Sequence, residues 1–455
     1  MKALKTAPLR AKTVLALAAI AVLGAGLGGC GTLDKLNVFD KKKNKVIASQ
    51  GERIPLIALN QKLEVSDVLK GQPFFLPASE PVTSWPQPGG ALDRWIDNLD
   101  AGAQFKIAWR KSFGQGSKRS VHVTAPPVAV DGRVYVMDAE AHVSALDAVS
   151  GERVWRTDVA QKTKRDKTAF GGGVSYADGK IFVTSGFRFA AALDAATGKL
   201  IWRTSVDAPI HGAPTIMGGR VYAISIDDEL MSFDIQTGDA GWTYQALTEP
   251  ARILSASSPA AAGDTVVAAF ASGELTALRA ANGNEEWTAV LSRTSRTNAL
   301  SEIRDIAGRP VIYKGDVYAG SHSGLFMTVD LRTGAPRWTL PVATITTPWP
   351  AGDVVFMISQ SGQVICASRE SGQVYWINEL NKGLKRKKRS LYFGPVLASG
   401  RLLVMSDDGK MLSLDPQTGA LKETLKLGSA VLIPPIAMNG MLYAVTDGAT
   451  LVAIR

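Results

Sequence analysis

The feature that most constrains how this chain can fold is a short phrase that recurs along most of its 455 residues. In "ALDAVSGERVW" a Gly is followed four residues later by Trp, and six copies of this pair keep the same inner distance. Successive Trp residues are 47, 40, 45, 51 and 38 positions apart. The pairs are Gly151/Trp155, Gly198/Trp202, Gly238/Trp242, Gly283/Trp287, Gly334/Trp338 and Gly372/Trp376. A period of about 45 residues with turn signals predicts a repeat architecture, and a propeller fits it best.

Each repeat is expected to contain four short antiparallel strands. In the first repeat, strands at 128–130 and 134–137 flank the turn dipeptide Asp131-Gly132, in which Gly accepts positive φ without penalty. Residues 143–146 supply a third strand, and Val154-Trp155 opens the fourth. A four-stranded unit of this kind cannot bury both of its faces alone. Stacking such units around an axis buries them, which is the principle of a propeller blade.

The number of repeats predicts eight blades. A seventh copy of the phrase, "SLDPQTGALKE", has Glu423 in the Trp position, and residues 431–455 then supply three strands without a fourth. The segment "FKIAW" (Phe105 to Trp109) carries a Trp 46 residues before Trp155. We therefore predict an all-β fold, an eight-bladed β-propeller of four-stranded antiparallel blades. An N-terminal strand would join the C-terminal blade, which closes the ring and leaves no open sheet edge.

Residues 1–29 are interpreted as a lipoprotein signal peptide. A basic start is followed by an apolar run of about sixteen residues, which is short for a membrane span. The next residues, "LGGC", resemble the lipobox of bacterial lipoproteins, so Cys30 is predicted to become the lipidated first residue. Gly31 follows where an Asp would resemble an inner-membrane retention signal, and this favours the outer membrane. The alternative is an ordinary secretory signal with a chance Cys.

Three further segments are expected after the signal peptide. Residues 30–50 form a flexible tether from the lipidated Cys, and residues 51–104 form an N-terminal extension that wraps the outside of the propeller. Within the extension, "RIPLIAL" is a candidate added strand. Residues 105–455 form the propeller. Cys366, the second Cys of the chain, lies in an apolar strand pattern and is expected to be a buried, inert thiol.

The repeats resemble those of the pyrroloquinoline-quinone (PQQ) propeller superfamily, whose signature phrase recurs over residues 105–455. With a lipobox, a single propeller and a tethered N-terminus, the chain resembles the BamB family of the outer-membrane β-barrel assembly (BAM) machinery. This resemblance implies a non-enzymatic scaffold at the periplasmic face of the outer membrane. It also implies binding to the POTRA domains of BamA, association with the rest of the BAM complex, and help in folding and inserting outer-membrane β-barrel proteins. Unfolded precursors of those proteins are further candidate partners.

The same resemblance places the BamA-binding site on two rim loops between adjacent central blades. The corresponding stretches are "EPARILSASSP" and "ALSEIRDIAGRP", and the residues selected are Arg252, Ile253, Leu254, Arg304 and Asp305. Ala307 stands where the family pattern has a second acidic residue. Aliphatic side chains beside a charge are suited to be binding hot spots. The alternative is that both loops are solvated and tuck their aliphatic side chains under the rim.

The conspicuous residues of the repeat are given structural roles. The rings are expected to pack between blades, with each N–H reaching a carbonyl, at Trp155, Trp202, Trp242, Trp287, Trp338 and Trp376. The four His residues show no metal spacing, so no catalytic residue, metal or cofactor is predicted. A PQQ-dependent periplasmic dehydrogenase resembles the chain in its repeats but carries adjacent Cys residues, which this chain lacks. That enzyme, or another propeller binding module, is the alternative function.

The positive charge of the chain is spread out rather than concentrated. The net charge is +10, and four of the basic residues lie in the signal peptide, so a nucleic-acid partner is not expected. One dense run, "KGLKRKKRS" (Lys382 to Ser390), has six basic residues in nine. It is a candidate contact for anionic lipid or an acidic partner, although a solvated loop is the more common explanation for such a run.

Overall fold

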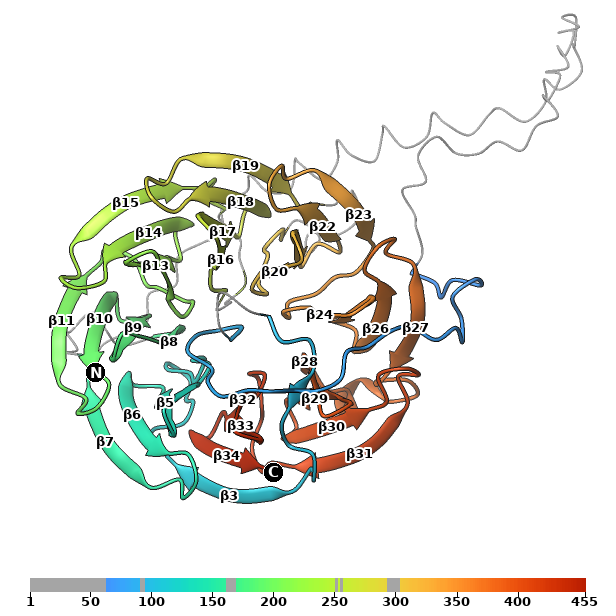
Figure 1. The fold of residues 1–455 in the computed structure, drawn as a ribbon, viewed down its shortest axis with the longest axis horizontal. Helices are drawn as coiled ribbons and strands as arrows, with labels where there is room; N and C mark the ends of the chain where they lie inside the picture. Colours follow the sequence, from blue (N-terminus) through green and yellow to red (C-terminus); the bar gives the residue numbers. More distant parts are fainter. Residues whose placement is uncertain (1–62, 91–94, 161–168, 250–252, 254–256, 293–302) are drawn as a thin grey trace, which may run out of the picture. The chain divides into compact units, whose positions relative to one another are not determined.

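A computed structural model describes residues 63–90, 95–160, 169–249, 253, 257–292 and 303–455. The chain divides into two units, Met1–Leu59 and Asn60–Arg455, and all of the described residues belong to the second. This unit is a ring of eight antiparallel sheets around a central axis (Figure 1). The predicted eight-bladed propeller is therefore confirmed. In each blade the first strand lies nearest the axis and the fourth lies at the periphery (Figure 1).

The first four blades follow the chain order of the repeats. Blade 1 contains β4 (Val128–Val130), β5 (Arg133–Met137), β6 (His142–Asp147) and β7 (Arg153–Asp158). Blade 2 contains β8 (Gly172–Ala177), β9 (Lys180–Ser185), β10 (Phe189–Asp194) and β11 (Leu200–Ser205). Blade 3 contains β12 (Thr215–Met217), β13 (Arg220–Ile224), β14 (Glu229–Asp234) and β15 (Ala240–Gln245). Blade 4 contains β16 (Ala260–Ala262), β17 (Thr265–Ala269), β18 (Glu274–Arg279) and β19 (Glu285–Val290).

The remaining blades complete the circle. Blade 5 contains β20 (Val311–Tyr313), β21 (Asp316–Gly320), β22 (Phe326–Asp330) and β23 (Pro336–Leu340). Blade 6 contains β24 (Trp349–Ala351), β25 (Val354–Ile358), β26 (Gln363–Ser368) and β27 (Val374–Glu379). Blade 7 contains β28 (Tyr392–Ala398), β29 (Arg401–Ser406), β30 (Lys410–Leu414) and β31 (Leu421–Lys426). Blade 8 contains β32 (Ile436–Met438), β33 (Met441–Thr446), β34 (Thr450–Ile454) and the N-terminal strand β3 (Ile107–Ser112).

The ring closes as the repeat count predicted. Strand β3 pairs antiparallel with β34, with Trp109 opposite Ala453. The strand begins at Ile107 rather than at Phe105, because Phe105 has a φ of 50° and turns the backbone before pairing starts. The two ends of the propeller are thus joined without a covalent bond, by the backbone hydrogen bonds of this pair and by side-chain contacts such as that of Trp109 with Tyr443.

The Trp of each Gly–Trp pair packs against the turn of the next blade, so that adjacent blades interlock. The six indole N–H groups donate to backbone carbonyls in the turn of the next blade, those of Ala195, Ile235, Ala280, Leu331, Arg369 and Pro416. The turn Gly of the next blade lies on the same ring. A Cβ at Gly238, for example, would lie 2.4 Å from Cε3 of Trp202. Gly is therefore favoured at this position for two reasons: it adopts the positive φ of 75° without strain, and it leaves room for the ring to approach the backbone.

The interlock explains why the seventh copy of the phrase lacks its Trp. Glu423 lies on β31, the outer strand of blade 7, and faces blade 8. The outer strand of blade 8 is β3, which reaches β34 across the chain ends and not through a Gly turn. No turn is therefore present to cover a ring at position 423. Glu423 instead forms an ion pair with Arg401 at 3.2 Å.

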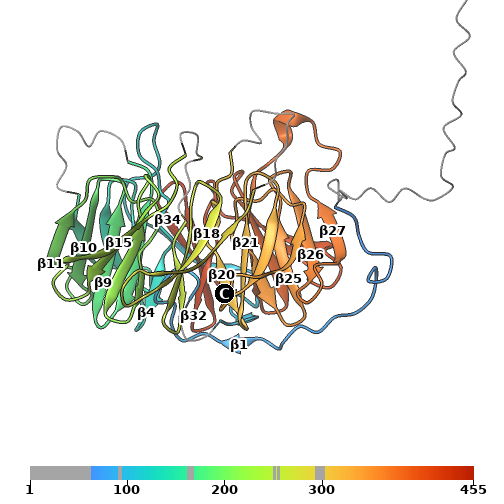
Figure 2. The ribbon, with the colours of Figure 1, turned by 90° about the horizontal axis from the view of Figure 1, so that it is seen from above.

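The segment before β3 runs from the outside of the ring to its axis (Figures 1 and 2). Val65 forms a parallel bridge with Val374 on the outer strand β27. The segment then continues to β1 (Glu80–Pro81) and β2 (Leu99–Asp100), which extend blade 7 at its inner edge, and to Trp85, which bridges Ala129 on β4. Trp85 and Leu99 of this segment are buried where it reaches the inner strands, whereas Val68 and Phe75, nearer its start, are exposed. "RIPLIAL" lies outside the described residues.

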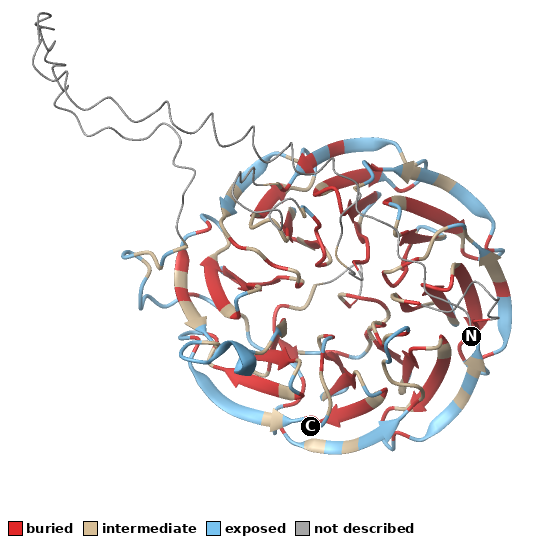
Figure 3. Ribbon diagram, turned by 180° about the vertical axis from the view of Figure 1, so that it is seen from behind, coloured by how far each residue is buried: buried red, intermediate tan, exposed pale blue. Residues whose placement is uncertain are grey.

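Burial follows the position of a strand in its blade. Inner and middle strands are buried almost throughout, whereas the outer strands expose alternate or successive residues (Figure 3). Cys366, on β26, is fully buried, and desolvation raises the pKa of its thiol well above the usual value. Among the residues with described positions, no helix is long and apolar enough to cross a membrane.

Candidate partner-binding rim and central cavity

Part of the predicted partner-binding site comes together on one rim. The carboxylate of Asp305 accepts the backbone N–H of Ile253 at 3.1 Å, although the two residues are 52 positions apart. Arg252 and Leu254 lie outside the described residues. The contact joins the two stretches that the sequence analysis selected, one between blades 3 and 4 and the other between blades 4 and 5.

Asp305 is buried, with only 2% of its surface exposed. Its backbone carbonyl accepts the N–H of His322 at 2.9 Å, and the N–H of Ile306 reaches the carbonyl of Phe270 at 3.3 Å. The buried carboxylate thereby holds the neighbouring loop in position through the N–H of Ile253. Ala307, which replaces the second acid of the family pattern, is also buried.

Arg304 differs from its neighbour because 45% of its side chain is exposed. One guanidinium nitrogen lies 4.0 Å from a carboxylate oxygen of Glu249, whose side chain is 32% exposed. An ion pair in contact with water contributes little to stability, so Arg304 can exchange Glu249 for an acidic group on a partner. Ile253 is half-buried beside it.

A second feature, which the sequence analysis missed, is a cavity of about 420 Å³ on the propeller axis. The N-terminal segment contributes Trp85, Pro88, Gly89 and Trp95 to its wall, and the inner ends of several blades contribute the rest. Ile253 also lines it, so the rim stretch reaches the axis. The lining is mainly apolar, with Arg309 as its basic side chain of fixed charge. The size lies within the range of sites for small molecules.

The sequence does contain a signal for this cavity, but it becomes visible only when the same position is compared across the repeats. In seven of the eight blades a Pro lies in the inner strand or just before it. The residues that directly precede these prolines are Pro126, Ala213, Ser258, Arg309, Thr347, Gly394 and Pro434. All of these except Ala213 line the cavity. Arg309 is the charged member of the set.

Comparison with known proteins decides the family. The family model described as outer membrane protein assembly factor BamB matches residues 99–165, 139–378 and 382–455. This chain belongs to the BamB family. The chain is 29% identical over 361 residues to BamB of Alkalilimnicola ehrlichii, with 79% of this chain and 91% of the relative covered. It is 26% identical over 343 residues to BamB of Burkholderia pseudomallei, with 74% and 85% covered.

Solved structures agree on the fold. The crystal structure of BamB from Moraxella catarrhalis matches with a TM-score of 0.65 and 21% identity, covering 76% of this chain and 98% of that one. A europium-containing methanol dehydrogenase matches with a TM-score of 0.62 and 16% identity, covering 80% and 89%. At these identities the likeness extends to the propeller alone. Membership of the BamB family favours a non-enzymatic role.

The residues of the axis do not fit a quinone and its metal. Asp447 is the carboxylate in the lining of the cavity, and it is already bound to the hydroxyl of Ser117. Across the described parts of the chain, no group of three or more His, Cys, Asp or Glu residues is arranged to hold a metal ion. Cys366 is buried within blade 6 and has no Cys neighbour in the sequence. We therefore derive no reaction through PQQ.

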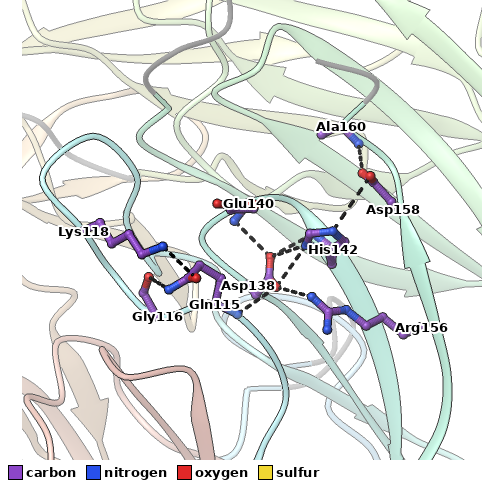
Figure 4. Close-up of polar contacts among 9 residues, drawn as sticks. All are labelled: Gln115, Gly116, Lys118, Asp138, Glu140, His142, Arg156, Asp158 and Ala160. Atoms are coloured by element: carbon purple, nitrogen blue, oxygen red, sulfur yellow. Dashed lines mark hydrogen bonds and ion pairs between the residues drawn. The ribbon is translucent and has the colours of Figure 1, made fainter.

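A buried polar cluster surrounds Asp138, directly after β5 (Figure 4). Its carboxylate accepts the backbone N–H groups of Gln115, Glu140 and His142 at 2.9–3.0 Å. The imidazole of His142 lies 3.1 Å away and the guanidinium of Arg156 lies 2.9 Å away. An Asp–His pair can orient a catalytic base, but this carboxylate is surrounded by five donors. The cluster fastens the segment after β3 to blade 1.

Replacing Asp138 by Asn is expected to lower the free energy of unfolding by about 1.5–3 kcal/mol. The change keeps the shape of the side chain but removes the charge that Arg156 and the backbone donors face. Denaturant unfolding followed by Trp fluorescence measures the effect. Asp158→Asn is the matched control, because that side chain is 64% exposed and lies 3.8 Å from His142. Equal effects of the two variants would contradict the structural role of Asp138.

The basic run forms an exposed projection. Residues Arg386–Lys388 form the short 3₁₀ helix η2, which has no buried residue. In side view, this coil projects beyond the strand ends on the face opposite β1 (Figure 2). The charges are thus available to an anionic surface.

Proposed function

We propose that this protein is a non-enzymatic scaffold lipoprotein of the β-barrel assembly machinery, which binds the POTRA domains of BamA and assists the insertion of outer-membrane β-barrel proteins. The observation that carries the proposal is the match to the BamB family model, which spans almost all of the propeller. The solved propellers of dehydrogenases support only the fold. The proposal includes anchoring by Cys30 at the periplasmic face of the outer membrane, with residues 30–50 as the tether.

The rim geometry supports a division of roles within the proposed BamA site. Arg304 and Ile253 make direct contact with the partner, together with Arg252 and Leu254 of the adjoining stretch. The carboxylate of Asp305 accepts the N–H of Ile253 and so holds the stretch around Ile253 in place. A half-buried aliphatic side chain beside an exposed Arg is the kind of pair that contributes most of the binding energy in many interfaces.

The double variant Ile253→Glu/Arg304→Glu is expected to weaken BamA binding by at least about tenfold. It places acidic groups where the proposal requires an apolar and a basic contact. The measurement is recovery of a BamA-like barrel by the acylated protein from detergent-solubilised envelopes, followed by titration with purified POTRA domains. The double variant Arg252→Glu/Leu254→Glu tests the other residues of the site in the same way.

Arg332→Glu is the control for the added negative charge, because Arg332 is exposed on a turn of blade 5 between β22 and β23. Equal recovery by all variants would retain the scaffold function and move the site elsewhere. Recovery of no barrel by the native protein would contradict the function itself. The dehydrogenase alternative would then be tested with PQQ and Ca²⁺, by looking for quinone absorbance retained on the protein.

A further inference from the structure

The central cavity combines a mainly apolar lining with the guanidinium of Arg309. Aromatic rings from distant parts of the chain line it, namely those of Trp85, Trp95, Phe170, Trp349 and Phe393. The rings of Trp95 and Trp349 lie 4.8 Å apart and belong to the N-terminal segment and to β24. Such a lining removes water from an apolar ligand and gains free energy in proportion to the area buried.

Arg309 stands at the wall of this cavity, and none of the described residues forms an ion pair with it. Its single hydrogen bond runs from Nε to the carbonyl of Pro259 at 3.4 Å, and no carboxylate among the described residues lies within 4.0 Å of the guanidinium. Desolvation lowers the pKa of Arg309 to about 10. A desolvated guanidinium with its other donors unused is costly, because Arg stays charged in proteins.

The surrounding backbone holds the guanidinium against the cavity. A Cβ at Gly89 would lie 2.1 Å from Nη1 and 2.8 Å from Cζ of Arg309, so the N-terminal segment passes directly over the charged group. Arg309 is half-buried, and it lines both the central cavity and the smaller one beside it. The charge is thus fixed in place at the cavity wall. The described carboxylate of the lining, that of Asp447, forms no ion pair with it and is bound to the hydroxyl of Ser117.

We propose that the central cavity binds a small organic anion with an apolar body, whose carboxylate pairs with Arg309. A guanidinium matches a carboxylate with two parallel hydrogen bonds, and the pair gains strength where water is excluded. The apolar body of the ligand contacts the aromatic wall. The site is separate from the proposed BamA contacts of Arg304, although Ile253 borders both.

The test compares decanoate with decanol, which has the same chain and no charge. Binding to the full mature protein is measured by titration calorimetry and by the fluorescence of the Trp residues in the lining, below the concentration at which decanoate forms micelles. Decanoate is expected to bind at least about tenfold more tightly than decanol, because a hydrogen bond to a charged group contributes that much. Arg309→Leu removes this difference and leaves decanol binding unchanged.

Arg309→Leu is expected to fold, since it replaces an unpaired charge by an apolar side chain in a desolvated place, and its melting temperature should equal or exceed that of the native protein. Arg332→Leu, at an exposed position, is the control and keeps the preference for decanoate. Thr347→Trp, which fills the cavity, abolishes binding of both ligands. The proposal is overturned if decanoate does not bind, if it binds no more tightly than decanol, or if Arg309→Leu or Thr347→Trp leaves its affinity unchanged.

Discussion

Replacing Trp202 by Ala is expected to lower the free energy of unfolding of the propeller by about 3–5 kcal/mol. The ring is 92% buried between blades 2 and 3, and its N–H donates to the carbonyl of Ile235 at 3.3 Å. The change therefore leaves a cavity and an unpaired carbonyl at a contact between two blades. Chemical denaturation, followed by circular dichroism, measures the loss.

Two further variants separate packing from the hydrogen bond. Trp202→Phe keeps most of the ring and removes the N–H, so it is expected to cost about 1 kcal/mol for the bond in addition to a smaller packing loss. Ile201→Ala changes the neighbouring residue, which is 45% exposed, and is expected to stay within about 0.5 kcal/mol of the native protein. A Trp202→Ala loss no larger than that of Ile201→Ala would show that the repeat Trp does not hold the blades together.

A double-mutant cycle tests the interlock itself. Gly238→Ala places a Cβ 2.4 Å from the ring of Trp202 and also meets a φ of 75°. In the Trp202→Ala background the collision with the ring disappears. The backbone strain and a close contact with Oγ1 of Thr204, 3.0 Å from the new Cβ, remain. The second substitution should then cost less than it does in the native protein, with a coupling energy of about 0.5–3 kcal/mol. Additive losses would contradict direct contact between the two residues.

Replacing Cys30 by Ser is expected to move the protein almost completely from the membrane fraction to the soluble periplasmic fraction. The reason is that each buried methylene of an acyl chain contributes about 0.8 kcal/mol, and stable anchoring requires more than one chain. Cys30 lies outside the described residues, and the expectation rests on "LGGC" at the end of the apolar run. Fractionation of envelopes and labelling with palmitate measure the change.

The chain offers a matched control for this experiment. Cys366→Ala removes the other Cys, which is buried in β26 and has a raised pKa, so it can neither be acylated nor anchor the folded protein. That variant should keep both the label and the membrane fraction. Label retained by Cys30→Ser, or lost from Cys366→Ala, would contradict the assignment of Cys30 as the lipidated residue.

The architecture could be predicted from the sequence because its determinants are local and repeated. Six of the eight blades carry a turn Gly with a Trp four residues later, and each repeat supplies its short apolar strands within about 45 residues. The strand that closes the ring could be inferred by counting, since the C-terminal blade has three strands and Trp109 lies one period before Trp155. The absence of Trp at position 423 is explained by the neighbouring blade 8. Its outer strand β3 comes from the N-terminal segment, so blade 8 has no Gly turn to cover a ring at that position.

What lies on the axis was decided by the tertiary structure. The sequence analysis selected Asp305 as a partner contact. In the structure its carboxylate is buried and accepts the N–H of Ile253. The sequence marks Arg309 only by its place before the Pro of an inner strand. That its guanidinium has no ion-pair partner among the described residues is seen only in the tertiary structure, where the N-terminal segment passes over it and the inner ends of the blades surround it. The physical reason is that desolvation and pairing of a charge depend on every group that converges on it. In this ring the residues that line the cavity lie up to more than 300 positions apart in the sequence. No local sequence pattern specifies that they meet.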